Sequence, residues 1–261
     1  MRIREYLRPS SLEEASALLR GSEDNRIVGG LTALKLANAS IGTAIDLSDL
    51  GLDYVRSEGG RLRLGAYASL RSVELSPLCR ASASGILARA AGRVGGVQLR
   101  SQVTLGGAVS SRWAISEILA ALLALDAELS FFGAGRVGLG AYLEKPVLAD
   151  ILVEVSFADL PRRGSLRSAR ISYLDYPLLA VAVAVGEGRP GGARIVSGAR
   201  PARSRLAEGA MRAFEAGADP RECGEIASGE LDFGDDARAS AEYRRRVCAK
   251  LAERALAEAT E

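Results

Sequence analysis

The chain has 261 residues, of which 48% are hydrophobic and 25% are charged. This composition is typical of a folded globular protein, and the length allows one large domain or two modest ones. The 34 basic and 32 acidic residues leave a net charge of +2, which is too balanced for the basic surface that nucleic-acid binding needs. We therefore expect a globular protein that does not bind nucleic acid.

Histidine is absent from the sequence. Catalysis by a Ser-His-Asp or Cys-His arrangement, metal ligation by imidazole and attachment of a flavin through histidine are therefore excluded. The three cysteines, Cys79, Cys223 and Cys248, lie far apart, without the Cys-x-x-Cys spacing of a cluster site. We expect free thiols in a reducing compartment, and the sequence offers no candidate catalytic residue and no metal site.

The first residues, Met1–Pro9, lack the apolar core of a signal peptide. No stretch approaches the ~18 apolar residues of a membrane span. We expect a cytoplasmic protein that does not associate with membranes.

Residues up to about 53 predict a small α/β subdomain. The run Ser11–Glu14 has the form of a capping box and predicts a helix. Arg26–Val28 predicts a short strand that leads directly into two glycines, and a brief helix over 33–38 and a strand over 43–47 follow.

A second subdomain is expected over about 54–160. The alternation around Gly59-Gly60 predicts a β-hairpin. Its other expected elements are helices near 73–75, 84–93 and 116–125 and a strand over 127–132. The stretch from Gly95 to Gly107 between them is punctuated by glycines.

The run Leu160–Arg167, with Pro161 and Gly164 among basic side chains, predicts a linker. A C-terminal domain is therefore expected over 165–261. Its expected elements are strands over 170–172, 178–185 and 193–197, a turn over 186–192, and helices over 203–216 and 237–259. In the last of these, Asp235-Asp236 suits the helix start.

Three glycine-rich segments are candidate ligand-binding loops. Gly133–Gly138 spells the G-x-G-x-x-G fingerprint of a dinucleotide site, which needs a helix that starts at its third glycine. Pro146 leaves no room for such a helix, so we interpret this segment as a hairpin turn.

The other two segments have a more suitable context. Ile27–Leu34 predicts a strand, two glycines and a helix start, which is either a phosphate-binding loop or an ordinary tight turn. Gln98–Ala108 contains a Thr-x-Gly-Gly turn, and Glu117 opens the next helix. The Glu117 carboxylate either accepts hydrogen bonds from ribose hydroxyls or favours the helix dipole.

Together these motifs resemble the FAD-binding (medium) subunit of the molybdenum hydroxylases, the family of xanthine dehydrogenases and aerobic carbon monoxide dehydrogenases. The two Gly-Gly loops, Glu117 and the run Leu122–Ala127 carry the resemblance. It covers nearly the whole chain, because further family signatures match Tyr6–Ala15, Ala44–Ser48, Arg61–Ala66 and Asp236–Arg245.

The resemblance implies an α+β (α/β) fold. An FAD-binding domain of the vanillyl-alcohol-oxidase/PCMH type would occupy residues 1–160 in two subdomains, followed by a C-terminal domain of a small antiparallel sheet with helices. Non-covalent FAD would lie between the two subdomains. The implied cofactor-binding residues are Val28, Gly29, Gly30, Leu31, Thr32, Ala33, Leu34, Val94, Gly95, Thr104, Gly106, Gly107, Ala108, Glu117, Ile151, Leu152, Arg167 and Tyr176.

The resemblance also implies roles within this set. The first loop would wrap the pyrophosphate, and Ile151 with Leu152 would contact the flavin ring. Arg167 would lie near the isoalloxazine and favour the reduced, anionic flavin. Tyr176 would either pack close to the ring or serve as a core aromatic.

The chain departs from the usual family loops at several positions. Leu31 and Thr32 replace a polar pair, Ala108 replaces asparagine and Glu117 replaces aspartate. Each lost side-chain hydrogen bond costs ~1 kcal/mol, whereas the backbone amides that bind pyrophosphate are unaffected.

The implied function is electron transfer in a xanthine- or purine-dehydrogenase-like molybdenum hydroxylase. Electrons would pass from the 2Fe-2S clusters of a small subunit through FAD to NAD+ or another acceptor, while a molybdopterin-binding large subunit acts on the substrate. The alternative is a non-catalytic scaffold subunit with weakened or lost FAD binding. The intact pairs Gly29-Gly30 and Gly106-Gly107 favour the flavoprotein.

Overall fold

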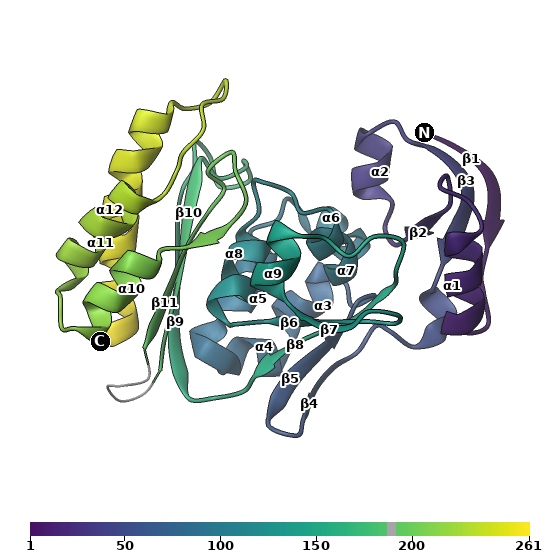
Figure 1. The fold of residues 1–261 in the computed structure, drawn as a ribbon, viewed down its shortest axis with the longest axis horizontal. Helices are drawn as coiled ribbons and strands as arrows, with labels where there is room; N and C mark the ends of the chain where they lie inside the picture. Colours follow the sequence, from purple (N-terminus) through teal and green to yellow (C-terminus); the bar gives the residue numbers. More distant parts are fainter. Residues whose placement is uncertain (187–191) are drawn as a thin grey trace.

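The computed structural model describes residues 1–186 and 192–261. Three units follow one another along the long axis of the molecule (Figure 1). Each is built on its own sheet, of three, five and four strands from the N-terminus to the C-terminus. The arrangement agrees with the expected α+β class.

The N-terminal subdomain is a parallel sheet of order β1-β3-β2. Its elements are β1 (Arg2–Leu7), α1 (Leu12–Arg20), β2 (Arg26–Val28), α2 (Thr32–Leu36), β3 (Ser40–Asp46) and the 3₁₀ turn η1 (Ser48–Leu50). Helix α1 begins as predicted, because the Ser11 hydroxyl accepts a hydrogen bond from the Glu14 amide. The Glu14 carboxylate accepts from the amide of Ser10 at 2.7 Å, one residue before the position that a capping box predicts.

The central subdomain is an antiparallel sheet of order β4-β5-β8-β6-β7 packed against helices. Its elements are β4 (Val55–Glu58), β5 (Arg61–Gly65), α3 (Leu70–Leu75), α4 (Pro77–Ala81), η2 (Ser82–Gly85), α5 (Ile86–Gly92), α6 (Val97–Gln102), α7 (Leu105–Ser110), α8 (Glu117–Ala124), β6 (Glu128–Phe131), β7 (Gly135–Gly138), α9 (Leu139–Glu144) and β8 (Leu152–Ala158). Every residue of α8 is buried, as expected of a helix that is apolar on all sides.

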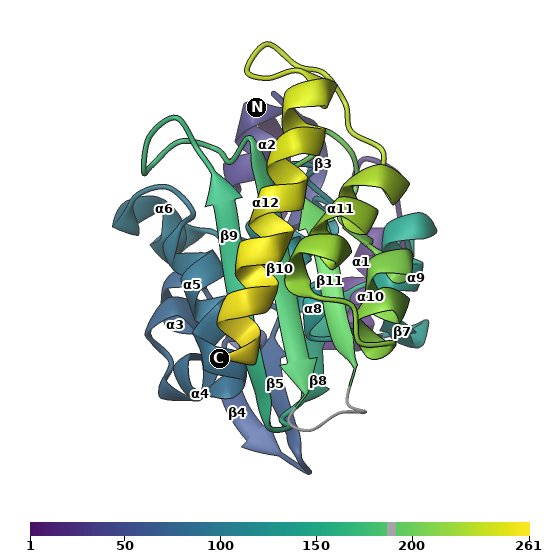
Figure 2. The ribbon, with the colours of Figure 1, turned by 90° about the vertical axis from the view of Figure 1, so that its left-hand side faces the viewer.

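The C-terminal unit is an antiparallel sheet of order β12-β11-β10-β9. Its elements are β9 (Arg162–Ala169), β10 (Leu179–Gly186), β11 (Ala193–Gly198), β12 (Arg205–Leu206), α10 (Glu208–Glu215), α11 (Pro220–Glu230) and α12 (Ala241–Thr260). The three helices cover its outer face (Figure 2). Alternate residues of β10 face them, including Val181 and Val183, while Ala182 and Ala184 join the core around α8.

Several sequence-based predictions were wrong in this unit. The predicted linker is largely β9, which pairs with β10 over its whole length. The predicted strand over 170–172 lies in the β9–β10 loop, and helix α11 and strand β12 were not predicted. The last helix begins after Ser240 rather than after Asp235-Asp236. The predicted turn over 186–192 lies mostly outside the described residues.

The interpretation of Gly133–Gly138 as a hairpin is confirmed, since β6 and β7 pair across it. The reason given for it was incomplete, because the six-residue helix α9 does fit between Gly138 and Pro146. The three cysteines are free and buried, as expected. None of the described helices is long and apolar enough to cross a membrane.

Candidate functional site

The two glycine loops that the sequence singled out meet at the junction between the N-terminal and central subdomains. A Cβ added at Gly29 would lie 2.6 Å from the Thr104 hydroxyl, and one added at Gly30 would overlap the Gln102 carbonyl group. Gly30 therefore requires glycine, because the backbone of Gln102 leaves no room for a side chain, and Gly29 has no room for one while the Thr104 side chain keeps its position.

The second loop is the start of helix α7, not the predicted turn. Thr104 is its N-cap, and the Thr104 hydroxyl accepts a hydrogen bond from the Gly107 amide at 3.1 Å. Gly106 is buried against Ala66, whereas Gly107 is exposed. Ala108 follows on the same helix and is half-buried.

The first loop leads into helix α2 without a side-chain cap. Leu31 is the N-cap residue, has a left-handed backbone with φ of 59°, and offers no side-chain hydrogen bond. Among the described residues, the amides of Thr32 and Ala33 therefore have no side-chain acceptor at the helix start, beside the exposed Gly29. Unpaired amides at a helix start suit an anionic group such as a pyrophosphate. The residues present therefore fit the anionic part of FAD.

Apolar side chains hold this first loop on its inner side. Leu31 and Leu34 are half-buried and pack against a small core that contains Val28. Leu31 and Thr32, which replace the polar pair of the usual family loop, thus have different effects. Leu31 contributes to packing, while Thr32 begins the helix.

Tyr67, which the sequence analysis did not identify as a site residue, connects this loop to the central subdomain through hydrogen bonds. Its hydroxyl donates to the Val28 carbonyl oxygen and accepts from the Leu47 amide at 2.8 Å. The same oxygen lies 3.1 Å from a carboxylate oxygen of Asp46. Burial raises the pKa of Tyr67 well above its usual value, which keeps the hydroxyl protonated as a donor.

Asp46 is ionised beside Tyr67. Burial opposes ionisation of this carboxyl group, but hydrogen bonds from Tyr6 and Ser48 lower its pKa below the usual range. Tyr6 donates to one carboxylate oxygen and the Ser48 amide donates to the other at 3.0 Å. The end of β3 is thus held by several hydrogen bonds where it adjoins the first loop.

Glu117 lies at the start of α8, and its carboxylate pairs with two arginines. Arg170 donates to one oxygen, and Arg93 lies 3.6 Å from the other. That second oxygen, Oε1, is buried without a hydrogen-bond partner among the described residues. The interpretation of Glu117 from the helix dipole alone is therefore incomplete, because its main partners are basic side chains distant in sequence.

Arg170 also organises the loop that joins β9 to β10. It donates to the carbonyl oxygen of Asp175 at 2.5 Å and to that of Tyr173 at 3.4 Å. Tyr176 in this loop is exposed, and its ring stacks on that of Trp113. Trp113 is a second aromatic residue of this region that the sequence did not indicate.

The remaining predicted residues lie in different settings. Val94 and Gly95 form the turn after α5, and the Gly95 carbonyl oxygen accepts from Arg100 at 2.5 Å. Ile151 and Leu152 are both buried in hydrophobic clusters. The structure therefore gives these two residues a role in the hydrophobic core.

Arg167 is not brought together with the glycine loops. It lies on the face of β9 that is turned toward α12, where its Nε atom is 2.9 Å from the Glu258 carboxylate. Arg170 is instead the basic residue at this end of the sheet that reaches Glu117.

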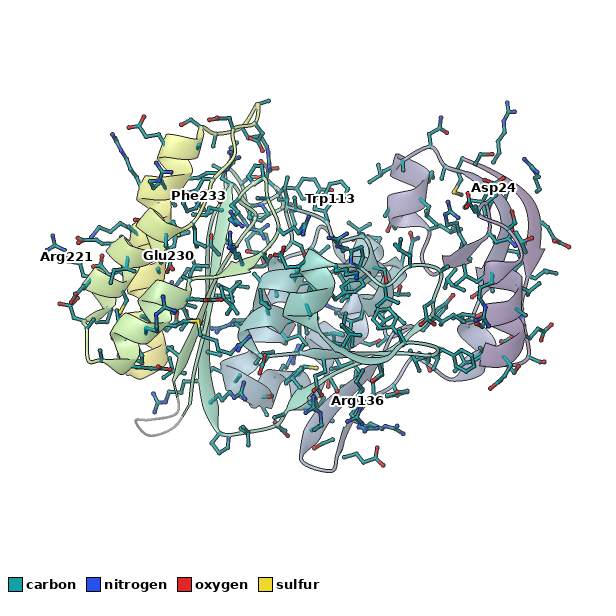
Figure 3. The ribbon with its side chains drawn as sticks, viewed as in Figure 1. Asp24, Trp113, Arg136, Arg221, Glu230 and Phe233 are labelled. Carbon is teal, nitrogen blue, oxygen red and sulfur yellow. The ribbon has the colours of Figure 1, made fainter. Side chains whose placement is uncertain are left out.

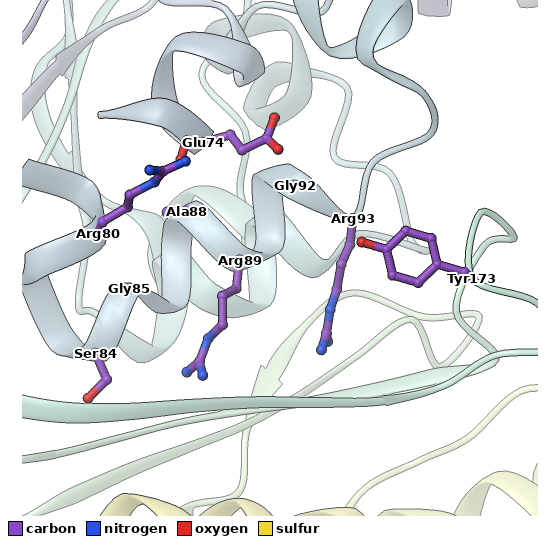
Figure 4. A pocket seen from close by; sticks show the side chains of 9 residues that line it. All are labelled: Glu74, Arg80, Ser84, Gly85, Ala88, Arg89, Gly92, Arg93 and Tyr173. Carbon is purple, nitrogen blue, oxygen red and sulfur yellow. The ribbon is translucent and has the colours of Figure 1, made fainter. Parts of the chain in front are cut away.

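A cavity of about 370 Å³ lies along α5, next to Tyr173 of the β9–β10 loop, and none of the predicted residues lines it (Figure 4). Its lining includes Arg80, Arg89, Arg93 and Tyr173. Arg89 and Arg93 point the same way from α5 and donate to carbonyl groups of β9. These arginines thus join α5 to the C-terminal sheet.

The comparison with known families decides the identity. Residues 1–155 match the family described as FAD binding domain in molybdopterin dehydrogenase. The chain belongs to this family. It is an FAD-binding oxidoreductase subunit of the molybdenum hydroxylase type, as its sequence motifs predicted.

Individual relatives cover most of the chain. The uncharacterized protein YgfM of Escherichia coli is 33% identical over 189 residues, which are 70% of each chain. The nicotine 6-hydroxylase medium subunit of Paenarthrobacter nicotinovorans is 27% identical over 97% of this chain and 96% of its own. A carbon monoxide dehydrogenase structure from Hydrogenophaga pseudoflava shares the fold, with a TM-score of 0.88 and 24% identity over 100% of this chain and 98% of that one.

Proposed function

We propose that this chain holds FAD across its two glycine loops and passes electrons in a molybdenum hydroxylase complex of the xanthine- or purine-dehydrogenase type. The observation that carries the proposal is the uncapped start of α2, where the amides of Thr32 and Ala33 lie beside the exposed Gly29 at the contact between the two subdomains. Backbone amides at such a helix start suit the pyrophosphate of a dinucleotide.

Each part of this surface has a distinct role in the proposal. The uncapped amides of Thr32 and Ala33 and the exposed Gly29 bind the pyrophosphate. Tyr67 orients the loop through the Val28 carbonyl. Glu117 acts through its arginine partners to fix the surrounding loops.

FAD can take up electrons one at a time and release them in pairs, so it suits the junction between one-electron and two-electron carriers. We infer that the electrons come from a 2Fe-2S small subunit and that a molybdopterin-binding large subunit acts on the substrate. NAD+ is the acceptor that we propose. The sequence holds no histidine, so the chain's own contribution is to bind, orient and shield the flavin rather than to transfer protons through imidazole.

The visible absorption spectrum of the purified chain tests the proposal, before and after incubation with FAD and desalting. We expect flavin bands that remain with the protein and are released into the supernatant by acid. A folded chain that retains no flavin, either alone or with its partner subunits, would contradict the proposal and leave the scaffold role. Reduction of NAD+ by the assembled complex with a purine substrate tests the acceptor and the substrate class separately.

A further inference from the structure

We propose that the cavity along α5 binds a small molecule that carries phosphate groups. The proposal goes beyond the proposed function, because none of the residues that line the cavity belongs to the cofactor-binding set implied by the resemblance. The volume of about 370 Å³ lies within the range of small-molecule sites. It exceeds what one inorganic phosphate fills, so a ligand of nucleotide size is expected.

The cavity carries an excess of positive charge. Three of the side chains that line it are arginines, Arg80 from α4 and Arg89 and Arg93 from α5 and its C-cap (Figure 4). Among the described residues of the lining, the one carboxylate is that of Glu74, which is already bound by two arginines outside the cavity at 2.8 Å each. Such an excess favours an anionic ligand.

Two of the three arginines have donors without partners. Nε of Arg80 donates to the Glu74 carbonyl oxygen at 2.9 Å, and its two Nη atoms have no hydrogen-bond acceptor among the described residues. The contacts of Arg93 with the Leu166 carbonyl and the Ser168 hydroxyl oxygen both use Nη1, at 3.4 Å, which is long for such a bond. Its Nε and Nη2 atoms lack an acceptor within the described chain. These donors are free to bind the oxygens of a ligand.

The carboxylates nearest to Arg89 and Arg93 are shared with other arginines. Arg89 lies 3.5 Å from Glu258, which an arginine of β9 approaches to 2.9 Å. Arg93 lies 3.6 Å from Glu117, which Arg170 approaches more closely. Nε of Arg89 is also buried without a hydrogen-bond partner in the part of the chain that the structure describes. A phosphate group would supply the acceptors that these guanidinium groups lack.

The wall of the cavity next to Arg89 is held in place by β9. Residues Ala83, Ser84 and Gly85 have φ of 44°, 54° and 73°, a left-handed backbone that is costly for the first two. The Ser84 hydroxyl accepts from the Gly164 amide at 3.3 Å, and Gly164 packs against the Ala83 carbonyl. The cavity therefore has its shape before a ligand arrives, which lowers the cost of binding.

Tyr173 of the β9–β10 loop lines the cavity beside Arg93 (Figure 4). The residue is 74% exposed, and its hydroxyl has no hydrogen-bond partner among the described residues. A phenolic O–H can donate to a phosphate oxygen without bringing a negative charge. Tyr173 thus adds a neutral donor to the three cationic side chains.

Titration with inorganic pyrophosphate tests the proposal, by calorimetry at constant ionic strength and in the presence of excess FAD. The excess of FAD keeps the glycine loops from serving as the site of the probe. We expect one site per chain, with a Kd that rises roughly tenfold or more in Arg80→Gln and in Arg89→Gln, because each removes a charge-assisted hydrogen bond. ADP carries the same diphosphate group and should bind at least as tightly.

The controls separate recognition of phosphate from loss of charge or of fold. Arg221→Gln makes the same change on α11, where the side chain is 73% exposed in the outer layer of helices (Figure 3), and should leave the Kd unchanged. Arg80→Lys keeps the charge without the planar fork and should recover part of the affinity. Arg89 also joins α5 to β9, so the Tm of each variant is measured. Arg80→Gln removes no contact with β9 and keeps the test decisive if Arg89→Gln unfolds.

Three outcomes would overturn the proposal. One is a native chain that binds neither pyrophosphate nor ADP, and another is a Kd that neither glutamine variant changes. The third is binding that excess FAD abolishes, which would place the probe at the glycine loops. If the native chain binds no pyrophosphate and both glutamine variants fail to assemble with their partner subunits, the cavity receives an acidic segment of a partner instead of a small molecule.

Discussion

Tyr67 joins the central subdomain to the first glycine loop through a single hydroxyl group. In Tyr67→Phe the Val28 carbonyl and the Leu47 amide both lose a partner in a buried setting. An unsatisfied buried polar group costs about 1–3 kcal/mol. We expect the variant to unfold at a lower denaturant concentration and to bind FAD more weakly, as measured by urea titration and by flavin titration.

Tyr54→Phe is the matched control. Tyr54 donates to the Glu154 carboxylate at 2.8 Å in the central sheet, and burial together with Glu154 raises its pKa to about 12. Loss of the Tyr54 hydroxyl group should lower the free energy of unfolding without a specific effect on FAD affinity. Equal effects of the two variants on FAD affinity would mean that Tyr67 does not position the loop.

Gly30 tests the contact between the loops more directly. A methyl group in Gly30→Ala would overlap the Gln102 carbonyl, so the two loops must separate. Such overpacking costs about 1–3 kcal/mol, and we expect a lower Tm and loss of flavin during desalting. Gly138→Ala is the control, since Gly138 has an ordinary φ of −62° and open space around it. A Gly30→Ala protein that keeps both its Tm and its flavin would contradict this account of the site.

Sequence reasoning found the residues whose role follows from their neighbours in the chain. The Ser11 cap of α1 belongs to this class. Tyr67 and Arg170 do not, because their partners lie 39 and 53 residues away. The position of Arg167 likewise depends on which face of β9 it occupies. The sequence analysis could not predict that face, because it interpreted the segment as a linker.

Among the elements, α12 is held to the C-terminal sheet by a buried arginine. Arg244 is fully buried and donates to the carbonyl oxygens of Leu178, Gly234 and Ala239. Its remaining partner is the Asp236 carboxylate at 2.7 Å. This cluster explains why the acidic pair that was predicted to begin the helix lies outside it.

Asp236 should therefore contribute pH-dependent stability. Burial opposes ionisation of Asp236, but hydrogen bonds from Arg244 and Arg238 lower its pKa far below the usual value. Because the pKa of Asp236 is lower in the folded chain than in the unfolded chain, its ionised form stabilises the fold above the unfolded-state pKa of about 3.9. This stabilisation is lost progressively as the pH falls from there toward the folded-state pKa. We expect Asp236→Asn to lose about 2 kcal/mol of unfolding free energy at pH 7. The difference from the native chain should shrink below about pH 4.

Asp232→Asn is the control for this pH dependence. Its carboxylate is 90% exposed and lies 3.9 Å from Arg205, so its removal should change the stability little at any pH. If the difference in unfolding free energy between Asp236→Asn and the native chain stays constant from pH 7 to pH 3, the ionic role of Asp236 is refuted.

The elements that sequence reasoning missed share a physical cause. Strand β9 contains Gly164, which in sequence resembles a break but in the structure packs against the Ala83 carbonyl. Helix α11 has a clear N-cap in Asp219 and a proline in its first turn, yet its weak apolar face gave little periodicity. Helix α1 was found because its cap and its apolar face agree with its packing, and α8 because its continuous apolar run marks a buried helix.

At the scale of the whole molecule, FAD should stabilise the fold by linking two subdomains. A ligand at 100 times its Kd adds ≈ 2.7 kcal/mol, which for a chain of this size corresponds to a rise in Tm of roughly 5–10 °C. We expect such a shift in thermal unfolding followed by circular dichroism. Riboflavin has no pyrophosphate and should raise the Tm far less. Equal shifts with riboflavin and FAD would show that the glycine loops do not hold the pyrophosphate.

The arrangement of the three units was predicted only through the resemblance. Local patterns indicated helices and strands, but they could not show that β8 returns to pair with β5 and β6 or that α8 contacts β10 and β11. Helix α8 itself is buried in the core between the central and C-terminal units.

The close approach of the two glycine loops has a consequence for evolution. Gly29 and Gly30 are constrained by Thr104 and Gln102, which belong to the chain itself. A descendant that had lost its flavin but kept the fold would still be unable to replace them. Intact glycine pairs in a relative therefore indicate that its two subdomains are in contact. They do not by themselves distinguish a working flavoprotein from a scaffold.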